Sequence, residues 1–244
     1  MEWFERWFGE EYLLVYEHRD GDEAERDVMA IERLLGLRPG EIVLDLCCGS
    51  GRHDLPLAAR GLRVVGLDYS SELLSIAHKA RLSGERYPVY VRADARDTVF
   101  RDGTFDAVLN LFTSFGYFTD GGNEQLLRSV CRMLKPAGRF YIDYLNPPCV
   151  LANLVERSEK NINGIGVIEI RRYVEEKRRV EKDITLTRNG ESMEFHESVR
   201  LYGPGEMSDM LVGAGLTVQG FLGSTDCDEY GADSERMIVY GRKD

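Results

Sequence analysis

The sequence has few of the residues that metal sites and disulfide frameworks require. The five cysteines are Cys47, Cys48, Cys131, Cys149 and Cys227. They are odd in number and show neither CxxC nor mixed Cys/His ligand spacing, so the pattern indicates neither a disulfide framework nor a zinc site. We therefore expect no metal ligands and reduced cysteines in a cytoplasmic protein.

Long apolar runs and an excess of basic charge are also missing. No stretch reaches the roughly 18 apolar residues of a membrane-spanning helix, and the first residues lack a basic segment followed by an apolar one. With 31 basic and 42 acidic residues, the net charge is −11, which disfavours a nucleic-acid backbone as a partner. We expect neither a membrane nor a nucleic-acid partner. The length of 244 residues suits one α/β domain with an insertion.

What the sequence does contain is a glycine loop after a buried strand. In residues 41–53 an apolar strand ends on Asp45, and Gly49 and Gly51 interrupt the chain before a helix. Glycines let the backbone approach a ligand closely, and a helix start offers unpaired N–H groups. Taken alone, the loop indicates either a ligand with hydroxyls or charge, or simply a tight strand-to-helix turn.

Acidic residues at the ends of the next two predicted strands narrow this choice. Asp68 follows Gly49 by about 20 residues, the spacing at which an acid meets ribose hydroxyls in nucleotide-binding βαβ units. Asp94 follows the third strand in the same way. Strands and helices alternate through residues 41–144, which predicts a doubly wound, mostly parallel sheet. Together these features predict an adenosine-bearing ligand at the carboxyl edge of the sheet.

Three further segments surround that edge. The N-terminal region has aromatic residues at helical spacing, including Tyr12, and predicts a helical cap that packs on the core or closes over the ligand. Residues 111–118 form an aromatic loop that either lines a site or packs under a helix. Residues 166–201 read as three extended runs, the last two joined by Asn189-Gly190, a strong hairpin signal. We expect this antiparallel segment to cover the carboxyl edge of the main sheet.

Five motifs in this order resemble those of the class I, Rossmann-like S-adenosylmethionine-dependent methyltransferases. They are Asp45-Leu-Cys-Cys-Gly49-Ser-Gly51, Asp68, Asp94-Ala95, the strand 105–111 and Leu134-Lys-Pro-Ala-Gly138. Gly51-Arg52-His53, the aromatic loop and Ser198-Val-Arg-Leu-Tyr202 resemble a bacterial small-molecule group with a β-insertion.

The resemblance implies a fold and a division into domains. The implied fold is α/β, with a doubly wound, mostly parallel seven-stranded sheet, a C-terminal antiparallel strand and an antiparallel β-insertion after strand five. Residues 1–40 would form the helical cap or lid, and residues 41–146 with 202–244 the S-adenosylmethionine-binding domain. Residues 147–201 would form the insertion, expected to cover the substrate.

The resemblance also implies the cofactor and its binding residues. The cofactor would be S-adenosylmethionine and the product S-adenosylhomocysteine. Asp45 would fix the loop or reach the amino group of the methionine part, Asp68 would hold the ribose, and Tyr69 would pack on the adenine. The implied binding set is Asp45, Cys47, Gly49, Gly51, Asp68, Tyr69, Asp94, Ala95, Asn110 and Leu111, with Tyr12 added from the lid. The chain departs from the family at Arg52 and His53, where a small residue is usual.

The acceptor is expected to be a nitrogen or oxygen of a small molecule, methylated by in-line displacement. Candidate bases are Tyr117 and His196, although a histidine on a strand is more often a packing or surface residue. Candidate substrate contacts are Phe115, Tyr117, Asp143 and Arg200, and Arg200 also suits an ion pair. One alternative is a non-catalytic scaffold that binds the same cofactor. A nicotinamide-dependent oxidoreductase is the other alternative, although Asp54 stands where its GxGxxG motif needs glycine.

Overall fold

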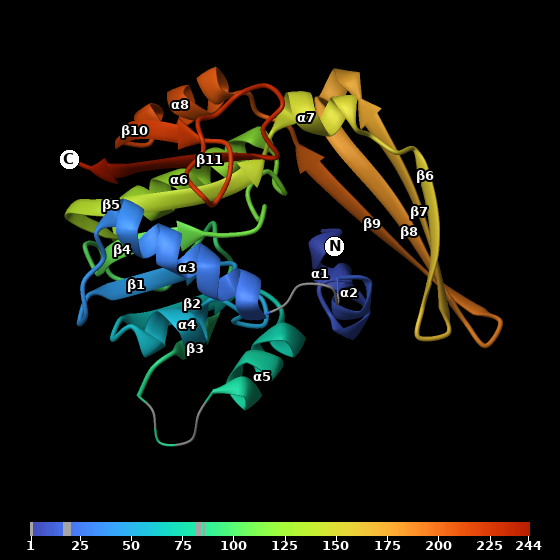
Figure 1. The fold of residues 1–244 in the computed structure, drawn as a ribbon, viewed down its shortest axis with the longest axis horizontal. Coiled ribbons are helices and arrows are strands. Elements are labelled where there is room, and N and C mark those ends of the chain that lie inside the picture. Colours follow the sequence, from blue (N-terminus) through green and yellow to red (C-terminus); the bar gives the residue numbers. More distant parts are fainter. Residues whose placement is uncertain (1, 17–20, 82–83, 85) are drawn as a thin grey trace.

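The computed structural model describes residues 2–16, 21–81, 84 and 86–244, and these form two β-sheets with flanking helices (Figure 1). The larger sheet has seven strands in the order β10-β11-β5-β4-β1-β2-β3. Its strands are β1 (Ile42–Leu46), β2 (Arg63–Asp68), β3 (Val89–Arg92), β4 (Phe105–Asn110), β5 (Leu134–Leu145), β10 (Leu216–Leu222) and β11 (Arg236–Lys243). Strand β11 runs antiparallel to both neighbours, and the pairs among β1 to β5 are parallel. The predicted fold class is confirmed.

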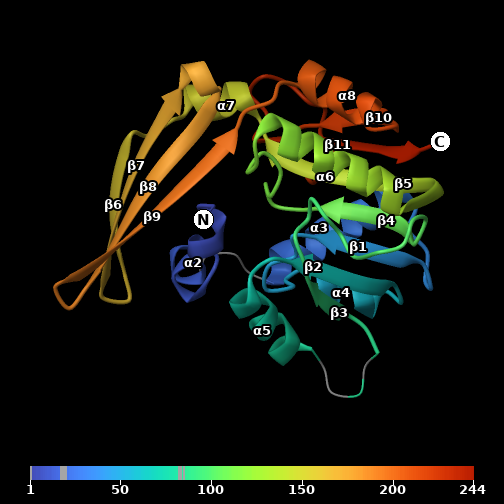
Figure 2. The same cartoon turned by 180° about the vertical axis from the view of Figure 1, so that it is seen from behind.

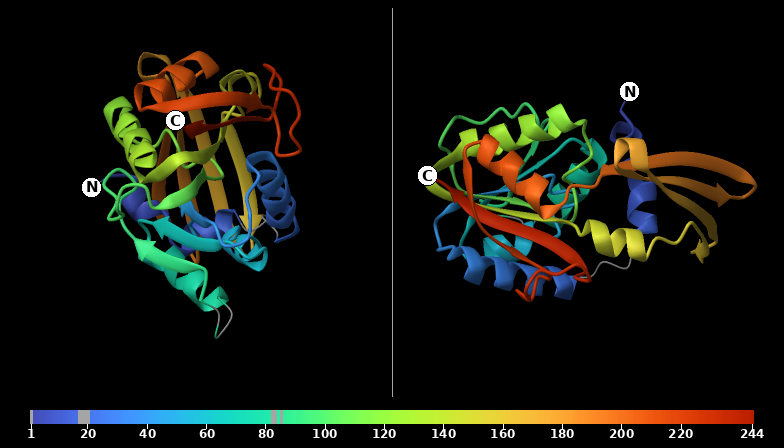
Figure 3. Two further views of the ribbon diagram at one scale, coloured as in Figure 1. Left: turned by 90° about the vertical axis from the view of Figure 1, so that its left-hand side faces the viewer. Right: turned by 90° about the horizontal axis from the view of Figure 1, so that it is seen from above.

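Helices cover both faces of this sheet because its central strands are apolar on both sides. Val43 of β1 packs with Ile31 of α3, whereas the next residue, Leu44, packs in the opposite cluster with Leu126 of α6. The helices are α3 (Gly21–Leu35), α4 (Asp54–Ala59), α5 (Ser71–Ala80), α6 (Asp120–Met133) and α8 (Pro204–Gly213). Helices α3 and α6 lie on opposite faces (Figure 3). This two-sided burial leaves the carboxyl edge of the sheet open for a site.

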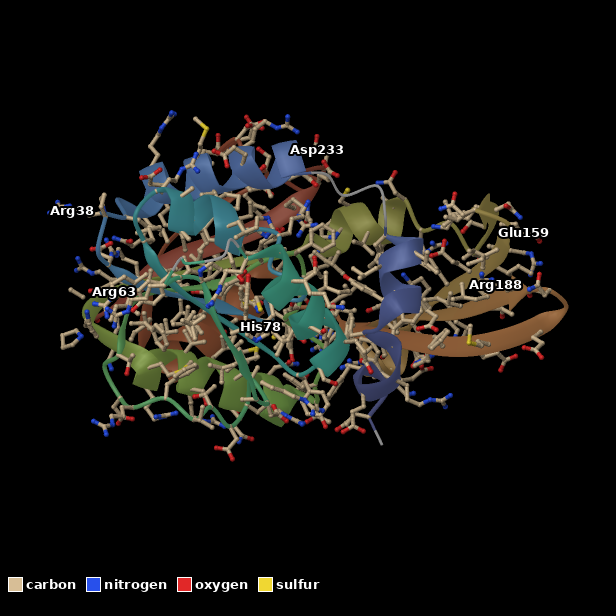
Figure 4. All side chains as sticks on the ribbon, turned by 90° about the horizontal axis from the view of Figure 1, so that it is seen from below. Arg38, Arg63, His78, Glu159, Arg188 and Asp233 are labelled. Atoms are coloured by element: carbon tan, nitrogen blue, oxygen red, sulfur yellow. The ribbon has the colours of Figure 1, made fainter. Side chains whose placement is uncertain are left out.

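The second sheet is the predicted insertion, with one strand that the sequence did not reveal. It consists of β6 (Arg157–Ile162), β7 (Ile165–Val174), β8 (Arg179–Arg188) and β9 (Glu191–Arg200), all antiparallel, with a 3-10 turn η1 (Glu175–Lys177) between β7 and β8. The three-run prediction missed β6 because its residues are almost all polar. Helix α7 (Pro147–Ala152) leads into the sheet. The sheet projects from the body, with Glu159 and Arg188 toward its outer part (Figures 2 and 4).

The N-terminal helices α1 (Phe4–Trp7) and α2 (Glu10–Val15) lie between the two sheets (Figures 1 and 2). Trp7 and Val15 pack against the apolar inner face of the insertion, whereas Phe4 belongs to the core of the main sheet. The two helices therefore bridge the insertion and the main domain. Among the described helices, none combines the length and apolar character needed to cross a bilayer.

Candidate active site

A cavity of about 530 Å³ lies at the carboxyl ends of β1, β2 and β3, beneath the N-terminal helices. Asp45, Asp68 and Asp94 line it, one from the end of each strand. Parallel strands end at the same edge, so acids far apart in sequence converge there. The cavity brings together most of the predicted cofactor residues, together with one predicted acceptor residue: Tyr12, Asp45, Cys47, Gly49, Asp68, Tyr69, Asp94, Ala95, Leu111 and Tyr117.

The glycine loop wraps tightly around the end of β2. Cys47, Gly49 and Gly51 have positive φ angles of 65°, 57° and 74°. Glycine adopts such a backbone without strain, whereas Cys47 is the non-glycine residue among the three. Asp68 holds this turn, because its two carboxylate oxygens accept hydrogen bonds from the Gly49 N–H at 2.9 Å and the Ser70 N–H at 2.8 Å. Burial raises the pKa of Asp68, and the backbone hydrogen bonds oppose that rise. Each carboxylate oxygen keeps a lone pair with which it can accept a ligand hydroxyl.

Asp94 and Tyr69 form the outer end of the cavity. Burial acts to raise the pKa of Asp94, but its hydrogen bonds to Arg96, at 2.7 to 3.2 Å, outweigh that effect and the pKa is lowered. The Tyr69 ring packs edge-on against the Phe4 ring, with 6.0 Å between the ring centroids, and the Tyr69 hydroxyl donates to the Glu5 carboxylate at 3.1 Å. This end thus offers an ionised carboxylate beside the aromatic rings of Tyr69, which follows β2, and Phe4 of α1.

Three predicted residues support the site without lining it. Gly51 lies against Tyr90, where any Cβ would overlap the tyrosine hydroxyl. The Asn110 amide donates to the Leu46 carbonyl at 2.8 Å and so joins β4 to β1. Phe115 is fully buried in the main core rather than at the acceptor site. The sequence pattern placed these residues near the site, but it could not show that Gly51 packs against Tyr90 or that the side chains of Asn110 and Phe115 turn into the protein.

A second cavity, of about 650 Å³, adjoins the first. Tyr12, Tyr16, Phe112 and Tyr117 line both cavities, so they form the boundary between them. The remaining walls come from α7 and the segment after it, the insertion, the start of β11, and Trp3, Thr113 and Leu145. The charged side chains among them are Arg171, Lys182, Glu197 and Arg236. Asp143, a predicted substrate residue, is not in the lining and instead pairs with Arg236 at 2.5 Å. The aromatic loop and the insertion therefore do meet at a cavity.

Arg179 fixes the aromatic loop at this boundary. Its guanidinium donates to the backbone carbonyls of Gly116, Tyr117 and Phe118 at 3.0, 2.9 and 3.0 Å. The Tyr117 ring also packs against the Trp3 ring, with 4.9 Å between the ring centroids. Sequence reasoning missed Arg179, because nothing in the pattern of β8 marks one arginine as the partner of a loop some 60 residues away.

Two other predicted residues lie outside both cavities. His196 is about one-third exposed and pairs with Asp183 on the neighbouring strand at 2.7 Å. Arg200 is buried between Asp120 and Glu206, each at 3.2 Å. The structure does not bring either residue to the cavities, and both follow the structural interpretations that the sequence already offered. Of the two proposed bases, Tyr117 is the one that lines a cavity.

Glu197 joins the N-terminal helices to the insertion. Its carboxylate accepts hydrogen bonds from the Trp7 indole at 2.5 Å and the Tyr16 hydroxyl at 3.0 Å, and it pairs with Lys182 at 2.5 Å. Lys182 and Glu197 are largely buried. Helices α1 and α2 cover the first cavity, and Glu197 lines the second. Its hydrogen bonds to Trp7 and Tyr16 therefore fix the covering segment against the insertion.

Replacing Glu197 by alanine is expected to loosen α1 and α2. The change leaves the Trp7 N–H without its acceptor and separates Lys182 from its closest carboxylate, so we expect a loss of about 2 kcal/mol in the free energy of unfolding. Hydrogen exchange should show faster exchange of the α2 amides, and chemical denaturation should show the loss of stability. Glu194→Ala, on the exposed part of the same strand, is the matched control. Equal protection of α2 in both variants would contradict this function of Glu197.

The first cavity fits S-adenosylmethionine. That cofactor carries an ammonium group, a ribose diol and an exocyclic amine, all hydrogen-bond donors. The cavity provides a carboxylate acceptor at three successive strand ends, and one oxygen of Asp45 is buried with no hydrogen bond from the described backbone N–H groups or basic side chains. Aromatic faces from Phe4, Phe8 and Tyr117 suit the adenine and the cationic sulfonium.

Comparison with known proteins agrees with this geometry. A family model described as a methyltransferase domain matches residues 43–138. The chain is 31% identical over 215 residues to a cypemycin N-terminal methyltransferase from a Streptomyces species, covering 82% of each chain. It is 37% identical over 124 residues to a demethylmenaquinone methyltransferase from Clavibacter sepedonicus, a match that covers 50% of this chain and spans about half of that relative's length, 49%.

A solved structure extends the similarity to the whole fold. A methyltransferase from Clostridium acetobutylicum, described as S-adenosylmethionine-dependent, superposes with a TM-score of 0.80 at 16% identity and covers 95% of each chain. The fold and the strand-end site define a Rossmann-like protein of the methyltransferase class. The chain belongs to the class I S-adenosylmethionine-dependent methyltransferases, whose cofactor is S-adenosylmethionine. Membership in this family excludes the nicotinamide-dependent oxidoreductase.

Proposed function

We propose that this protein transfers a methyl group from S-adenosylmethionine to a nitrogen or oxygen of a small acceptor held in the second cavity. The observation that carries the proposal is the shared boundary of the two cavities at Tyr12, Tyr16, Phe112 and Tyr117. A donor in one cavity and an acceptor in the other would meet there. The bound cofactor supplies an electrophilic methyl group on a sulfonium sulfur.

The residues around the boundary position the reactants and exclude water. The N-terminal helices cover the first cavity, Arg179 fixes the backbone of the aromatic loop, and Glu197 holds the cover against the insertion. Alignment of this kind can supply on the order of 7 to 11 kcal/mol toward the barrier of an in-line displacement. A dedicated base is therefore unnecessary, and Tyr117 is the candidate base that lines the boundary.

The second cavity favours a neutral acceptor atom. Its cations have carboxylate partners: Arg236 pairs with Asp143, Lys182 with Glu197, and Arg171 with Glu169. Its other walls are mainly apolar, and an apolar site favours the neutral form of an amine, the form that can attack the methyl carbon. The relative from Streptomyces is named as an N-terminal methyltransferase, which supports an amine acceptor for this chain.

Release of S-adenosylhomocysteine in the presence of acceptor mixtures tests the proposal. Purified protein is incubated with S-adenosylmethionine and separate pools of small amines, amino-terminal peptides and alcohols. We expect release above the background hydrolysis rate with one pool, and amines are the favoured class. Binding of S-adenosylmethionine without release in any pool would instead support the non-catalytic scaffold.

A further inference from the structure

A cluster of three acidic groups lies directly beneath the glycine loop. It consists of Asp45 at the end of β1, Asp54 at the start of α4 and Tyr90 on β3, with exposed fractions of 1%, 0% and 8%. Within the described residues, no backbone N–H or basic side chain donates to Asp45 Oδ1, to either carboxyl oxygen of Asp54 or to the Tyr90 hydroxyl. Their nearest titratable neighbours are one another, because the carboxyl group of Asp54 interacts with both Asp45 and Tyr90. A hydrogen bond between two carboxyl groups requires a proton on one of them.

Two glycines make room for the cluster. A Cβ at Gly66 of β2 would lie 2.8 Å from Asp54 Oδ2 and 2.8 Å from Cys48 Sγ. A Cβ at Gly51 would overlap the Tyr90 hydroxyl. Even a methyl group at either position would displace the acidic side chains, so the cluster is closely packed from the sides of β2 and of the loop.

The surrounding charges distinguish the two carboxyl groups. Burial is the largest cause that raises the pKa of Asp45 and of Asp54, and the charge of Asp45 raises the pKa of Asp54 further. Nearby His53 and Arg52 favour the ionised form of Asp45, although they also pair with Asp27 and Glu23 of α3 at 3.3 and 2.5 Å. The titratable groups around the cluster are Glu23 and Asp27 on α3, Cys48, Arg52 and His53 in the loop, Asp68 on β2, and His78 on α5, which contacts the Tyr90 ring.

We propose that Asp54 is protonated at neutral pH and is a positioning residue, donating the hydrogen bond that holds the Asp45 carboxylate toward the first cavity. The Tyr90 hydroxyl is the neighbouring neutral donor available to Asp54 in turn. Two ionised carboxylates buried side by side would repel each other, and the shared proton removes that repulsion. The cavity then carries one negative charge at this end, which matches a single ammonium group. The inference rests on the proposed function for the position of the methionine ammonium beside Asp45.

Three variants test the positioning by titration calorimetry with S-adenosylmethionine at pH 7.5. Asp54→Leu removes the hydrogen bond and is expected to weaken affinity at least tenfold, whereas Asp54→Asn keeps a neutral donor and should restore it to within threefold of wild type. Asp45→Asn should weaken affinity at least thirtyfold. Wild-type affinity in Asp45→Asn would refute the position of the methionine end, and with it the proposed site. A loss in Asp54→Asn as large as in Asp45→Asn would refute the protonated Asp54 alone.

The pH dependence of stability provides a readout that a merely structural residue would not change. Because the pKa of Asp54 is raised on folding, the folded state binds more protons than the unfolded state above about pH 4, and its stability falls as pH rises. The asparagine side chain of Asp54→Asn cannot titrate. As the pH rises from 5 to 8, the Tm of the wild type should therefore fall relative to the Tm of Asp54→Asn. Near pH 4 this pH-dependent difference should disappear. A Tm difference that is independent of pH would contradict the proposal.

Carbon NMR of the wild-type protein tests the proton directly, even if a variant fails to fold. The protein is labelled with carboxyl-¹³C aspartate, and the Asp54 signal is assigned by its absence from Asp54→Asn, or as the remaining buried signal after the exposed aspartates are identified with a paramagnetic relaxation agent. We expect one buried carboxyl carbon to keep the chemical shift of a protonated acid at pH 7. Ionised shifts for every aspartate at pH 7 would overturn the proposal.

Discussion

Replacing Asp68 by alanine is expected to lower the affinity for S-adenosylmethionine by roughly a hundredfold or more. Two ribose hydroxyls donating to one carboxylate contribute hydrogen bonds to a charged acceptor, each about 1.5 kcal/mol or more, and their sum of about 3 kcal/mol corresponds to that factor. The variant also frees the Gly49 and Ser70 N–H groups, so the glycine loop loses its anchor. Titration calorimetry measures the affinity, and circular dichroism checks that the fold is retained.

Asp97→Ala is the matched control for this experiment. Asp97 is an exposed aspartate in the loop after β3 and does not line the first cavity. Its removal changes the net charge by the same amount, so an equal loss in both variants would reflect general electrostatics rather than ribose binding. Unchanged affinity in the folded Asp68→Ala variant would refute the position of the ribose.

Replacing Tyr117 by alanine is expected to have the second large effect, on turnover. The side chain lines both cavities and packs on Trp3 and Phe8, so its loss opens a gap at the boundary. We expect kcat to fall by roughly a hundredfold, because a small misplacement of the reacting atoms can cost that much. The affinity for S-adenosylmethionine should change less than tenfold, because the strand-end carboxylates remain. Single-turnover kinetics with an identified acceptor measures the chemical step.

Tyr117→Phe separates shape from proton transfer. A general base contributes roughly 10² to 10⁴-fold, so a similar loss in the phenylalanine variant would indicate that the hydroxyl accepts the proton. If shape and water exclusion dominate, the phenylalanine variant should retain most of the turnover. Tyr87→Phe, whose hydroxyl contacts Arg63 at the edge of the sheet, is the control. Full turnover in Tyr117→Ala would show that this boundary is not where transfer occurs.

The cofactor end of the site was predictable because it depends on strand ends. Asp45, Asp68 and Asp94 each follow an apolar run, and a parallel sheet places the ends of successive strands along one edge. The aromatic loop was predictable for the same reason, since it follows β4. What these patterns could not predict is which neighbouring residues line the cavity, because Gly51 lies against Tyr90 and the Asn110 amide joins β4 to β1.

The acceptor end was less predictable because it depends on contacts between distant segments. Glu197 meets Trp7 across 190 residues, and Arg179 meets the loop carbonyls across 61 to 63. No local periodicity marks such pairs. Strand β6 was missed for a different reason, because a polar edge strand lacks the apolar alternation that reveals a strand.

Deleting the insertion would not isolate its function at the acceptor cavity, because the insertion also packs on the N-terminal helices. Its inner face, with Val167, Ile184 and Leu186, packs on the helices that cover the first cavity. A truncated protein would therefore lose the support of its lid together with the acceptor cavity. Single substitutions at Glu197 and Tyr117 separate these two functions.

The central claim is that S-adenosylmethionine occupies the first cavity with its methyl group directed at the boundary with the second. A crystal structure of the protein with S-adenosylhomocysteine tests it most directly. The account predicts the ribose hydroxyls within hydrogen-bond distance of Asp68, the amino group beside Asp45 and the sulfur facing Tyr117. A ligand bound elsewhere, or bound in this cavity with its sulfur directed away from Tyr117, would contradict the account.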